Sequence, residues 1–256
     1  MLDVHPPHSA THTWKDFFIH IATIVIGLII AVGLEQTVEA LHHAHQRRAL
    51  REALHRDTEI NNAWAKENVQ TLDRRSHWAM DQLDVVERAG PSGSLKIARL
   101  PKDTIWLPNT GVWLSATQNG EASLLTTGEQ NWFTDLNRVE NDAFVAPAGP
   151  SSRMRDALNE LERQLIHRNT VLPSGELDLS VLTPAERVQL NDCLRNVIEA
   201  SRFFERSNLT YGIYTEYLLT FPFDQLEESN SLQHAWSITK RHRDEHPDLA
   251  PTFQTP

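Results

Sequence analysis

The longest uninterrupted apolar run in the chain lies near its N-terminus, at residues 17–34. It reads FFIHIATIVIGLIIAVGL and contains no formally charged side chain. A helix of this length rises ~27 Å, close to the thickness of the hydrocarbon core of a bilayer. Trp14 and Lys15 precede the run, where an indole and a long cationic side chain favour the membrane interface. The pattern predicts one transmembrane helix at residues 14–36, with the lipid bilayer as its partner.

Two alternatives to a membrane anchor stay open. Ala31-Val32-Gly33 has the small residues of a signal-peptidase site, so the run could be the core of a cleaved signal peptide. A buried helix of a soluble protein could be equally apolar. The anchor is favoured because the run is longer than the usual core of a signal peptide, and because the helical pattern continues beyond it without a break.

Beyond the apolar run, amphipathic segments alternate with short breaks rich in proline and glycine. Residues 35–88 contain neither residue, which predicts one long helix continuous with the membrane helix. Its apolar stripe has spacings of three and four with gaps, and comprises Leu50, Leu54, Trp64, Val69, Leu72, Ala79, Leu83 and Val86. A break at 89–94 and a proline-containing connector at 95–109, with a short extended piece, lead to a short helix at 111–118.

Two capping boxes predict later helix starts. Thr126 precedes Glu129 by three residues, and Thr183 precedes Glu186 in the same way, with Pro184 between them. The first helix has an apolar side comprising Trp132, Phe133, Leu136, Val139 and Phe144. The second runs to about residue 220, with inward positions at Leu190, Cys193, Leu194, Val197, Phe204, Tyr211, Tyr214 and Leu218.

Two further helices complete the prediction. One covers residues 152–171, with the stripe Met154, Leu158, Leu161 and Leu165, and a weaker one covers residues 224–243. Aromatic side chains expected in the core, or holding the connector against it, are Trp106, Trp113, Tyr211, Tyr214 and Tyr217.

Amphipathic helices joined by short breaks predict an all-α fold, in which the transmembrane helix continues into a long helix that packs in an antiparallel helical bundle. The predicted layout is a disordered N-terminal tail at 1–13, the transmembrane helix at 14–36, a helical domain at 37–247 and a loose C-terminal tail at 248–256.

The composition is that of a folded globular chain, with 40% hydrophobic and 23% charged residues. A net charge of −10 without a basic stripe argues against nucleic acid as a partner. The single cysteine, Cys193, precludes an internal disulfide and is expected to pack in the core. The sequence contains no phosphate loop, nucleophile elbow or dinucleotide glycine motif. We therefore predict no catalytic residue and no cofactor, and favour a non-enzymatic module for protein interaction or sensing.

Small residues recur every four positions within the apolar run, at Thr23, Gly27 and Ala31. A face of this kind lets two membrane helices approach closely. We therefore predict a helix-pairing face, with a second copy of the chain or another membrane protein as the partner. The competing interpretation is that small residues are simply frequent in membrane helices.

Acidic and imidazole side chains gather just after the apolar run, with Glu39, His42 and His43 as candidate metal ligands and Glu35 one turn before them. The alternative function is therefore a metal-binding protein or a metal-dependent enzyme. The same Glu-x-x-His spacing recurs at Glu52, but ~20 Å along the same helix, so the two sets do not form one site. The favoured interpretation is a solvated polar collar beside lipid headgroups.

Two blocks of the sequence resemble a group of uncharacterised bacterial proteins. The first comprises Trp14-Lys15-Asp16-Phe17-Phe18-Ile19-His20, Thr23-Ile24, Gly27-Leu28-Ile29-Ile30-Ala31 and Leu34-Glu35. The second comprises Trp113-Leu114-Ser115-Ala116, Asn119-Gly120, Ser123-Leu124-Leu125 and Leu136. The resemblance implies a single-pass anchor in the inner membrane of a bacterial cell and a helical domain of unknown function. It carries no activity and no catalytic residue.

The side of the membrane on which the helical domain lies is left open. Lys15 precedes the apolar run, whereas Arg47, Arg48, Arg51 and Arg56 follow it, which favours a cytoplasmic domain. These arginines begin about three turns beyond the run, which weakens the inference. The resemblance points to the outer side instead.

Overall fold

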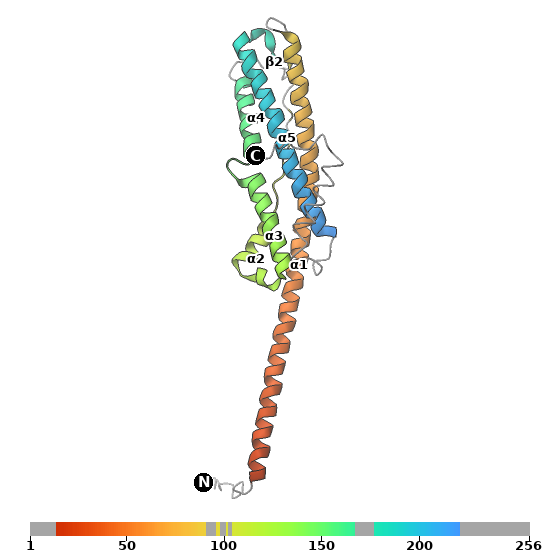
Figure 1. Cartoon of the computed structure of the whole chain (residues 1–256), viewed down its shortest axis with the longest axis vertical. Coiled ribbons are helices and arrows are strands. Elements are labelled where there is room, and N and C mark those ends of the chain that lie inside the picture. The colour runs from red at the N-terminus through yellow and green to blue at the C-terminus, as the bar shows by residue number, and fades with distance from the viewer. Residues whose placement is uncertain (1–13, 91–95, 98–100, 102–103, 167–176, 221–256) are drawn as a thin grey trace, which may run out of the picture. The chain divides into compact units, whose positions relative to one another are not determined.

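The computed structural model describes residues 14–90, 96–97, 101, 104–166 and 177–220 (Figure 1). The helices are α1 (Trp14–Ala89), α2 (Gly111–Gln118), α3 (Thr127–Glu140), α4 (Pro150–Ile166) and α5 (Pro184–Thr220). Short helical turns occur at η1 (Glu121–Leu124), η2 (Asn141–Val145, a π-turn) and η3 (Leu179–Val181). The predicted all-α class is confirmed.

A two-residue antiparallel pairing accompanies the helices. β1 (Lys96–Ile97) pairs with β2 (Leu177–Asp178), with Lys96 opposite Asp178 and Ile97 opposite Leu177. The extended piece expected in the connector at 95–109 is therefore present, whereas its partner at 177–178 was not predicted. Two paired residues make no sheet with a core of its own, so the class is unaffected.

The chain divides into two compact units, Met1–Ala49 and Leu50–Pro256, which we call the N-terminal unit and the helical unit. α1 passes through both without a break, as the absence of proline and glycine at residues 35–88 predicts. In the N-terminal unit the described apolar side chains are exposed, whereas burial begins at Leu50.

Burial along α1 within the helical unit follows spacings of three and four without a gap. The buried positions at this spacing are Leu50, Leu54, Thr58, Asn61, Ala65, Asn68, Leu72, Arg75, Ala79, Gln82 and Val86, and Asn62, Thr71 and Ser76 are buried beside them. The predicted stripe was right at Leu50, Leu54, Leu72, Ala79 and Val86, but Trp64, Val69 and Leu83 are only partly buried. Buried polar residues occupy the gaps in the predicted apolar stripe. They are Thr58 and, at intervals of seven, Asn61, Asn68, Arg75 and Gln82.

The helix starts follow the capping chemistry in the sequence. Thr126 Oγ1 accepts a hydrogen bond from the backbone N–H of Glu129, whose carboxylate accepts one from the backbone N–H of Thr126. Thr183 and Glu186 make the same reciprocal pair before α5. Both predicted capping boxes are confirmed. α4 begins at Pro150, two residues before the expected start.

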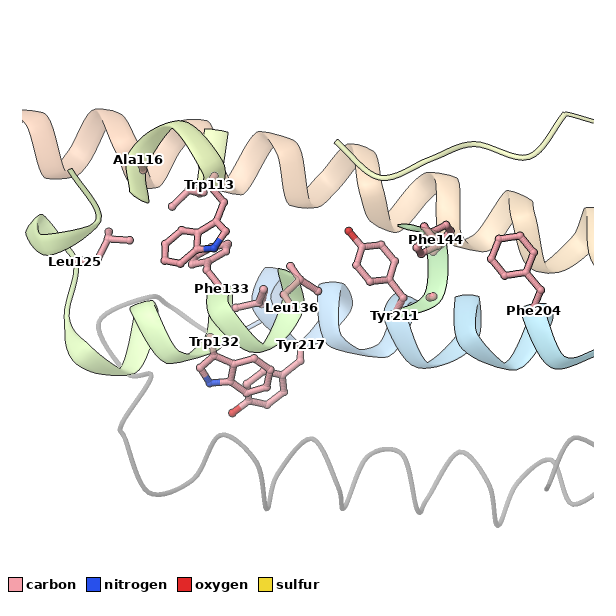
Figure 2. Close-up of a cluster of buried hydrophobic side chains, with 14 of the residues drawn as sticks. Trp113, Ala116, Leu125, Trp132, Phe133, Leu136, Phe144, Phe204, Tyr211 and Tyr217 are labelled. Carbon is pink, nitrogen blue, oxygen red and sulfur yellow. The ribbon is translucent and has the colours of Figure 1, made fainter. Parts of the chain in front are cut away.

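Aromatic side chains fill the core of the helical unit (Figure 2). Trp132 of α3 stacks on Tyr217 of α5, with ring centroids 4.6 Å apart, and meets Tyr214 edge-on at 5.7 Å. Phe144 of η2 meets Phe204 and Tyr211 edge-on. The α5 tyrosines expected to be core or interface aromatics include two in the core, since Tyr211 and Tyr217 are buried, and Tyr214 is partly buried and packs against them.

Helices α4 and α5 lie side by side (Figure 1). Between them and α1 is a second buried cluster, which contains Leu161, Leu194 and Val197. Cys193 belongs to this cluster, as expected from its apolar helix face. The predicted helix at 224–243 and the tails at 1–13 and 248–256 lie outside the described residues, as does the end predicted for α4 at residue 171.

Candidate functional site

Two acidic side chains and a tyrosine meet inside the helical unit. Glu140 ends α3 and Tyr211 lies in the C-terminal third of α5, and they are only 5% and 1% exposed. The Tyr211 hydroxyl donates a hydrogen bond to Oε1 of Glu140. Asp57 of α1 is the third member, and its charge acts on both others. The cluster thus brings ionisable groups of three helices together.

Asp57 borders a cavity of about 20 Å³, a volume that admits one water molecule. Its Oδ1 accepts a hydrogen bond from Nδ2 of Asn109 at 3.0 Å, whereas its buried Oδ2 has no hydrogen-bond partner in the described part of the chain. The residues around the cavity are Leu54, Asp57, Thr58, Asn61, Asn109, Thr110, Trp113, Phe133, Leu136, Asn137 and Glu140. A water molecule here would satisfy Oδ2 of Asp57.

Burial dominates the proton affinity of the cluster. It raises the pKa of Glu140 to about 7, because the opposing effect of the Tyr211 hydrogen bond is smaller and the nearby charge of Asp57 adds to the rise. Burial also raises the pKa of Asp57, with Arg56 and a backbone hydrogen bond opposing it. The pKa of Tyr211 is raised by burial and by Glu140. Glu140 therefore changes charge near neutral pH while Tyr211 stays protonated.

A second buried carboxylate, Glu205 of α5, lies outside this cluster. Burial raises its pKa to about 7, and the charge of Asp73 adds to the rise. Arg202, Arg206 and His77 act in the opposite direction but do not cancel it. The helical unit therefore holds two carboxylates that titrate near neutrality.

Two asparagines of α1 hold the connector in place through its backbone. Asn61 accepts from the N–H of Asn109 at 2.8 Å and donates to its carbonyl at 3.0 Å. Asn68 does the same with Trp106, at 2.9 and 2.8 Å. Seven residues of helix rise ~10.5 Å, and three extended residues span ~10 Å. The distance between the two asparagines along α1 therefore matches the distance between Trp106 and Asn109 along the connector, so both asparagines bind the connector at once. The connector runs antiparallel to α1.

Stacking reinforces this attachment. Trp106 of the connector stacks on Trp64 of α1, with ring centroids 5.7 Å apart, and Trp113 stacks on Phe133 at 5.4 Å. Trp106 thus holds the connector against α1 as the sequence predicts, whereas Trp113 packs α2 against α3. Asn68 additionally donates to Oδ1 of Asn208, which links α5 to the same point.

We expect Asn68→Ala to lower the free energy of unfolding by ~2–3 kcal/mol, because it leaves the part-buried backbone groups of Trp106 and the buried Oδ1 of Asn208 without their partner. Chemical denaturation of the detergent-solubilised chain measures the loss. Gln70→Ala, an exposed change two residues along α1, is the control and should alter stability by less than ~0.5 kcal/mol. Equal stabilities of the two variants would contradict the connector role of Asn68.

The residues proposed from sequence lie in the N-terminal unit. Glu39, His42 and His43 are exposed on α1, with the two imidazole rings 6.5 Å apart. Among the described residues, no group of three or more His, Cys, Asp or Glu side chains is placed to hold a metal ion. Metal binding at Glu39 stays a prediction, which elemental analysis of the purified protein tests.

The predicted pairing face is also exposed. Thr23, Gly27 and Ala31 lie on α1, Thr23 Oγ1 donates to the carbonyl of Ile19, and a Cβ added at Gly27 would meet no atom within 4 Å. The start of α1 is long and apolar enough to cross a membrane, and none of its most apolar stretch is buried.

Sequence reasoning missed Asp57, Asn61, Asn68 and Glu140 as functional candidates. The available signal was the polar residue at every seventh position from Asn61, which marks polar groups within a buried seam. Glu140 had no such signal, because it is the last residue of α3 and is buried by contacts from η2 and α5.

Comparison with known proteins adds no further assignment. No protein-family model matches the chain. No curated protein matches it. No solved structure matches it either.

Proposed function

We propose that this chain is a membrane-tethered helical module of a bacterial inner membrane, which binds a partner protein or senses a signal without catalysing a reaction. The observation that carries the proposal is the exposure of the apolar run at residues 17–34. Its large side chains, from Phe17 to Leu34, are between 42% and 68% exposed.

A bilayer accounts for this exposure. Leu, Ile, Phe and Val at the centre of a membrane helix each favour insertion by about 0.3–0.6 kcal/mol, and the run contains no charged residue to oppose them. The core helix of a soluble protein buries such side chains against other helices, which none of these does in the described structure. The tether is therefore favoured over a soluble helix, and the test below distinguishes it from a cleaved signal peptide.

The helical unit supports a binding role rather than catalysis. We infer that α1, α4 and α5 form an antiparallel bundle, because all three contribute to one buried cluster, with Ala79 from α1, Leu161 from α4 and Leu194 from α5. The cavity beside Asp57 has room for one water molecule and not for an organic substrate, whereas a hollow of about 530 Å³ between α4 and α5, beside Arg153, Glu160 and Phe203, lies at the surface and is open to solvent. Partner binding on the outside of such a bundle fits the solid aromatic core around Trp132.

Fractionation tests the tether. We expect the full-length chain in the membrane pellet after alkaline extraction, with its N-terminus intact. Ile26→Arg combined with Ile29→Arg should move it to the soluble fraction, because each arginine at the centre of a membrane helix costs about 2.5–3.5 kcal/mol. Gln36→Arg with Thr37→Arg, beyond the apolar run, is the control and should stay in the pellet.

A wild-type chain found in the soluble fraction with an intact N-terminus would overturn the tether. A mature chain lacking residues 1–33 would identify a signal peptide instead. Co-purification from detergent then tests the binding role, and a monomer without an associated protein would contradict it. A reporter fused at Pro256 determines which side of the membrane the helical unit occupies.

A further inference from the structure

Apolar exposure on α1 continues past the end of the apolar run. Glu35 and Gln36 end the run, yet Val38 and Leu41 beyond them are 65% and 66% exposed, and Leu34 at its end is 62% exposed. Leu41 lies seven residues beyond Leu34, a rise of ~10 Å along the helix. If Leu34 ends the part in the hydrocarbon, lipid tails do not cover Leu41. Val38 and Leu41 therefore require a protein surface. Together with Leu34, at the edge of the hydrocarbon, we call them the juxtamembrane stripe.

The juxtamembrane stripe has the spacing of a coiled-coil seam. Ala31, Leu34, Val38 and Leu41 follow one another at intervals of three, four and three, and Gly27 extends the pattern backward by four. Counting Ala31 as position a places Val38 at a, with Leu34 and Leu41 at d. A β-branched residue at a with leucine at d is the combination that favours parallel two-stranded coils.

We propose that the juxtamembrane stripe is the contact surface for a second copy of this chain, in a parallel two-helix coil. The inference rests on the proposed tether, because two copies that cross one bilayer in the same direction bring identical residues to the same depth. A two-fold axis parallel to the helices then places Val38 against Val38 and Leu41 against Leu41.

Charge at the edges of the seam permits this pairing. In a parallel coil, position g of one helix faces position e of the next heptad in its partner. The pair outside the apolar run is Thr37 with His42, so no two like charges face each other there. Glu39 and His43 occupy the outer positions b and f, which stay in solvent.

The same pattern fixes the end of the coil. The next a and d positions after Leu41 are His45 and Arg48. Two guanidinium groups at one d level repel each other, so the seam ends near His45. In the membrane part, Gly27 and Ala31 leave room for close approach of the two backbones. The coil therefore includes Gly27 and Ala31 of the predicted pairing face, with Thr23 at the flanking position g, and continues into the stretch beyond.

Cysteine cross-linking in isolated membranes tests the proposal. In a Cys193→Ala background, single cysteines replace Leu34, Val38 or Leu41, and copper phenanthroline oxidises neighbouring thiols to disulfides. We expect a dimer band at twice 29.2 kDa that is several-fold stronger at these positions than for the controls Gln36→Cys and Ala40→Cys, which lie on the outer face. Strong bands at both Leu34 and Leu41 establish the parallel orientation, because an antiparallel pair centred on Val38 separates each from its own copy.

A second variant separates contact from proximity. Val38→Lys should reduce cross-linking at Leu34→Cys several-fold, whereas Ala40→Lys should leave it unchanged. Equal cross-linking at all positions, or a maximum at Gln36 and Ala40, would overturn the proposal while leaving the tether intact. A cross-linked band of another mass would assign the juxtamembrane stripe to a different protein. A chain absent from the membrane pellet would instead mean that the tether itself is wrong.

Discussion

Replacing Arg51 by methionine should lower the free energy of unfolding of the helical unit by ~3–5 kcal/mol, because it leaves a buried charge without its partner. Glu129 has no solvent exposure, and the Arg51 guanidinium donates to both of its carboxylate oxygens, at 2.7 and 3.1 Å. The same carboxylate caps α3 by accepting from the N–H and the hydroxyl of Thr126. Losing Arg51 therefore weakens both an interhelix contact and a helix start.

The measurement is urea unfolding of the full chain in detergent, followed by tryptophan fluorescence, since Trp132 lies on α3 one turn after Glu129. Arg88→Met is the matched control, because Arg88 pairs with Asp84 at the surface of the same helix and such pairs contribute less than ~1 kcal/mol. The double change Arg51→Met with Glu129→Gln should recover part of the loss, because the amide keeps the capping geometry without the charge. A loss of less than ~1 kcal/mol for Arg51→Met alone would contradict the role assigned to this pair.

Local chemistry in the sequence was enough to predict the helices. The part of α1 beyond residue 34 follows from a long stretch without proline or glycine, α2 from the glycine and asparagine that bound it, and α3 and α5 from their capping boxes. These signals act within a few residues of each other, so they can be read before the fold is known. The sequence likewise predicted that Trp132 and Tyr211 would be buried, since both lie on apolar helix faces.

The polar interior was not predictable in the same way. The predicted apolar stripe of α1 leaves out Asn61 and Asn68, because an asparagine usually favours the surface or a turn. Their burial depends on the connector, whose backbone supplies the hydrogen bonds. Its bonding residues lie 48 positions from Asn61 and 38 positions from Asn68 in the sequence. The π-turn η2 and the burial of Glu140 likewise depend on packing against α4 and α5.

Stability of the helical unit should fall as the pH rises from about 5 to about 8. Glu140 and Glu205 both have an ordinary pKa of 4.5 and a pKa of about 7 in the folded chain. Between these values the folded state keeps protons that the unfolded state has released, so each rise in pH favours unfolding. Each carboxyl group accounts for ~3 kcal/mol of lost stability once the pH exceeds its folded pKa.

Glu140→Gln isolates the contribution of the cluster with Asp57 and Tyr211. The amide oxygen can still accept the hydrogen bond from Tyr211, but it carries no charge at any pH. At pH 8 we therefore expect this variant to be more stable than the wild type, by ~2–3 kcal/mol. At pH 4, where Glu140 is protonated in both states, the difference should be less than ~1 kcal/mol.

Glu67→Gln, an exposed change on α1, is the control and should leave the pH profile of stability unchanged. Glu205→Gln should remove a separate part of the slope, because its pKa responds to Asp73 and His77 rather than to Tyr211. Unfolding curves recorded at intervals from pH 4 to pH 8 give the slope for each variant. If Glu140→Gln and the wild type lose stability equally over this range, then Glu140 is ionised in the folded chain at neutral pH, and the cluster holds a charge that burial alone would expel.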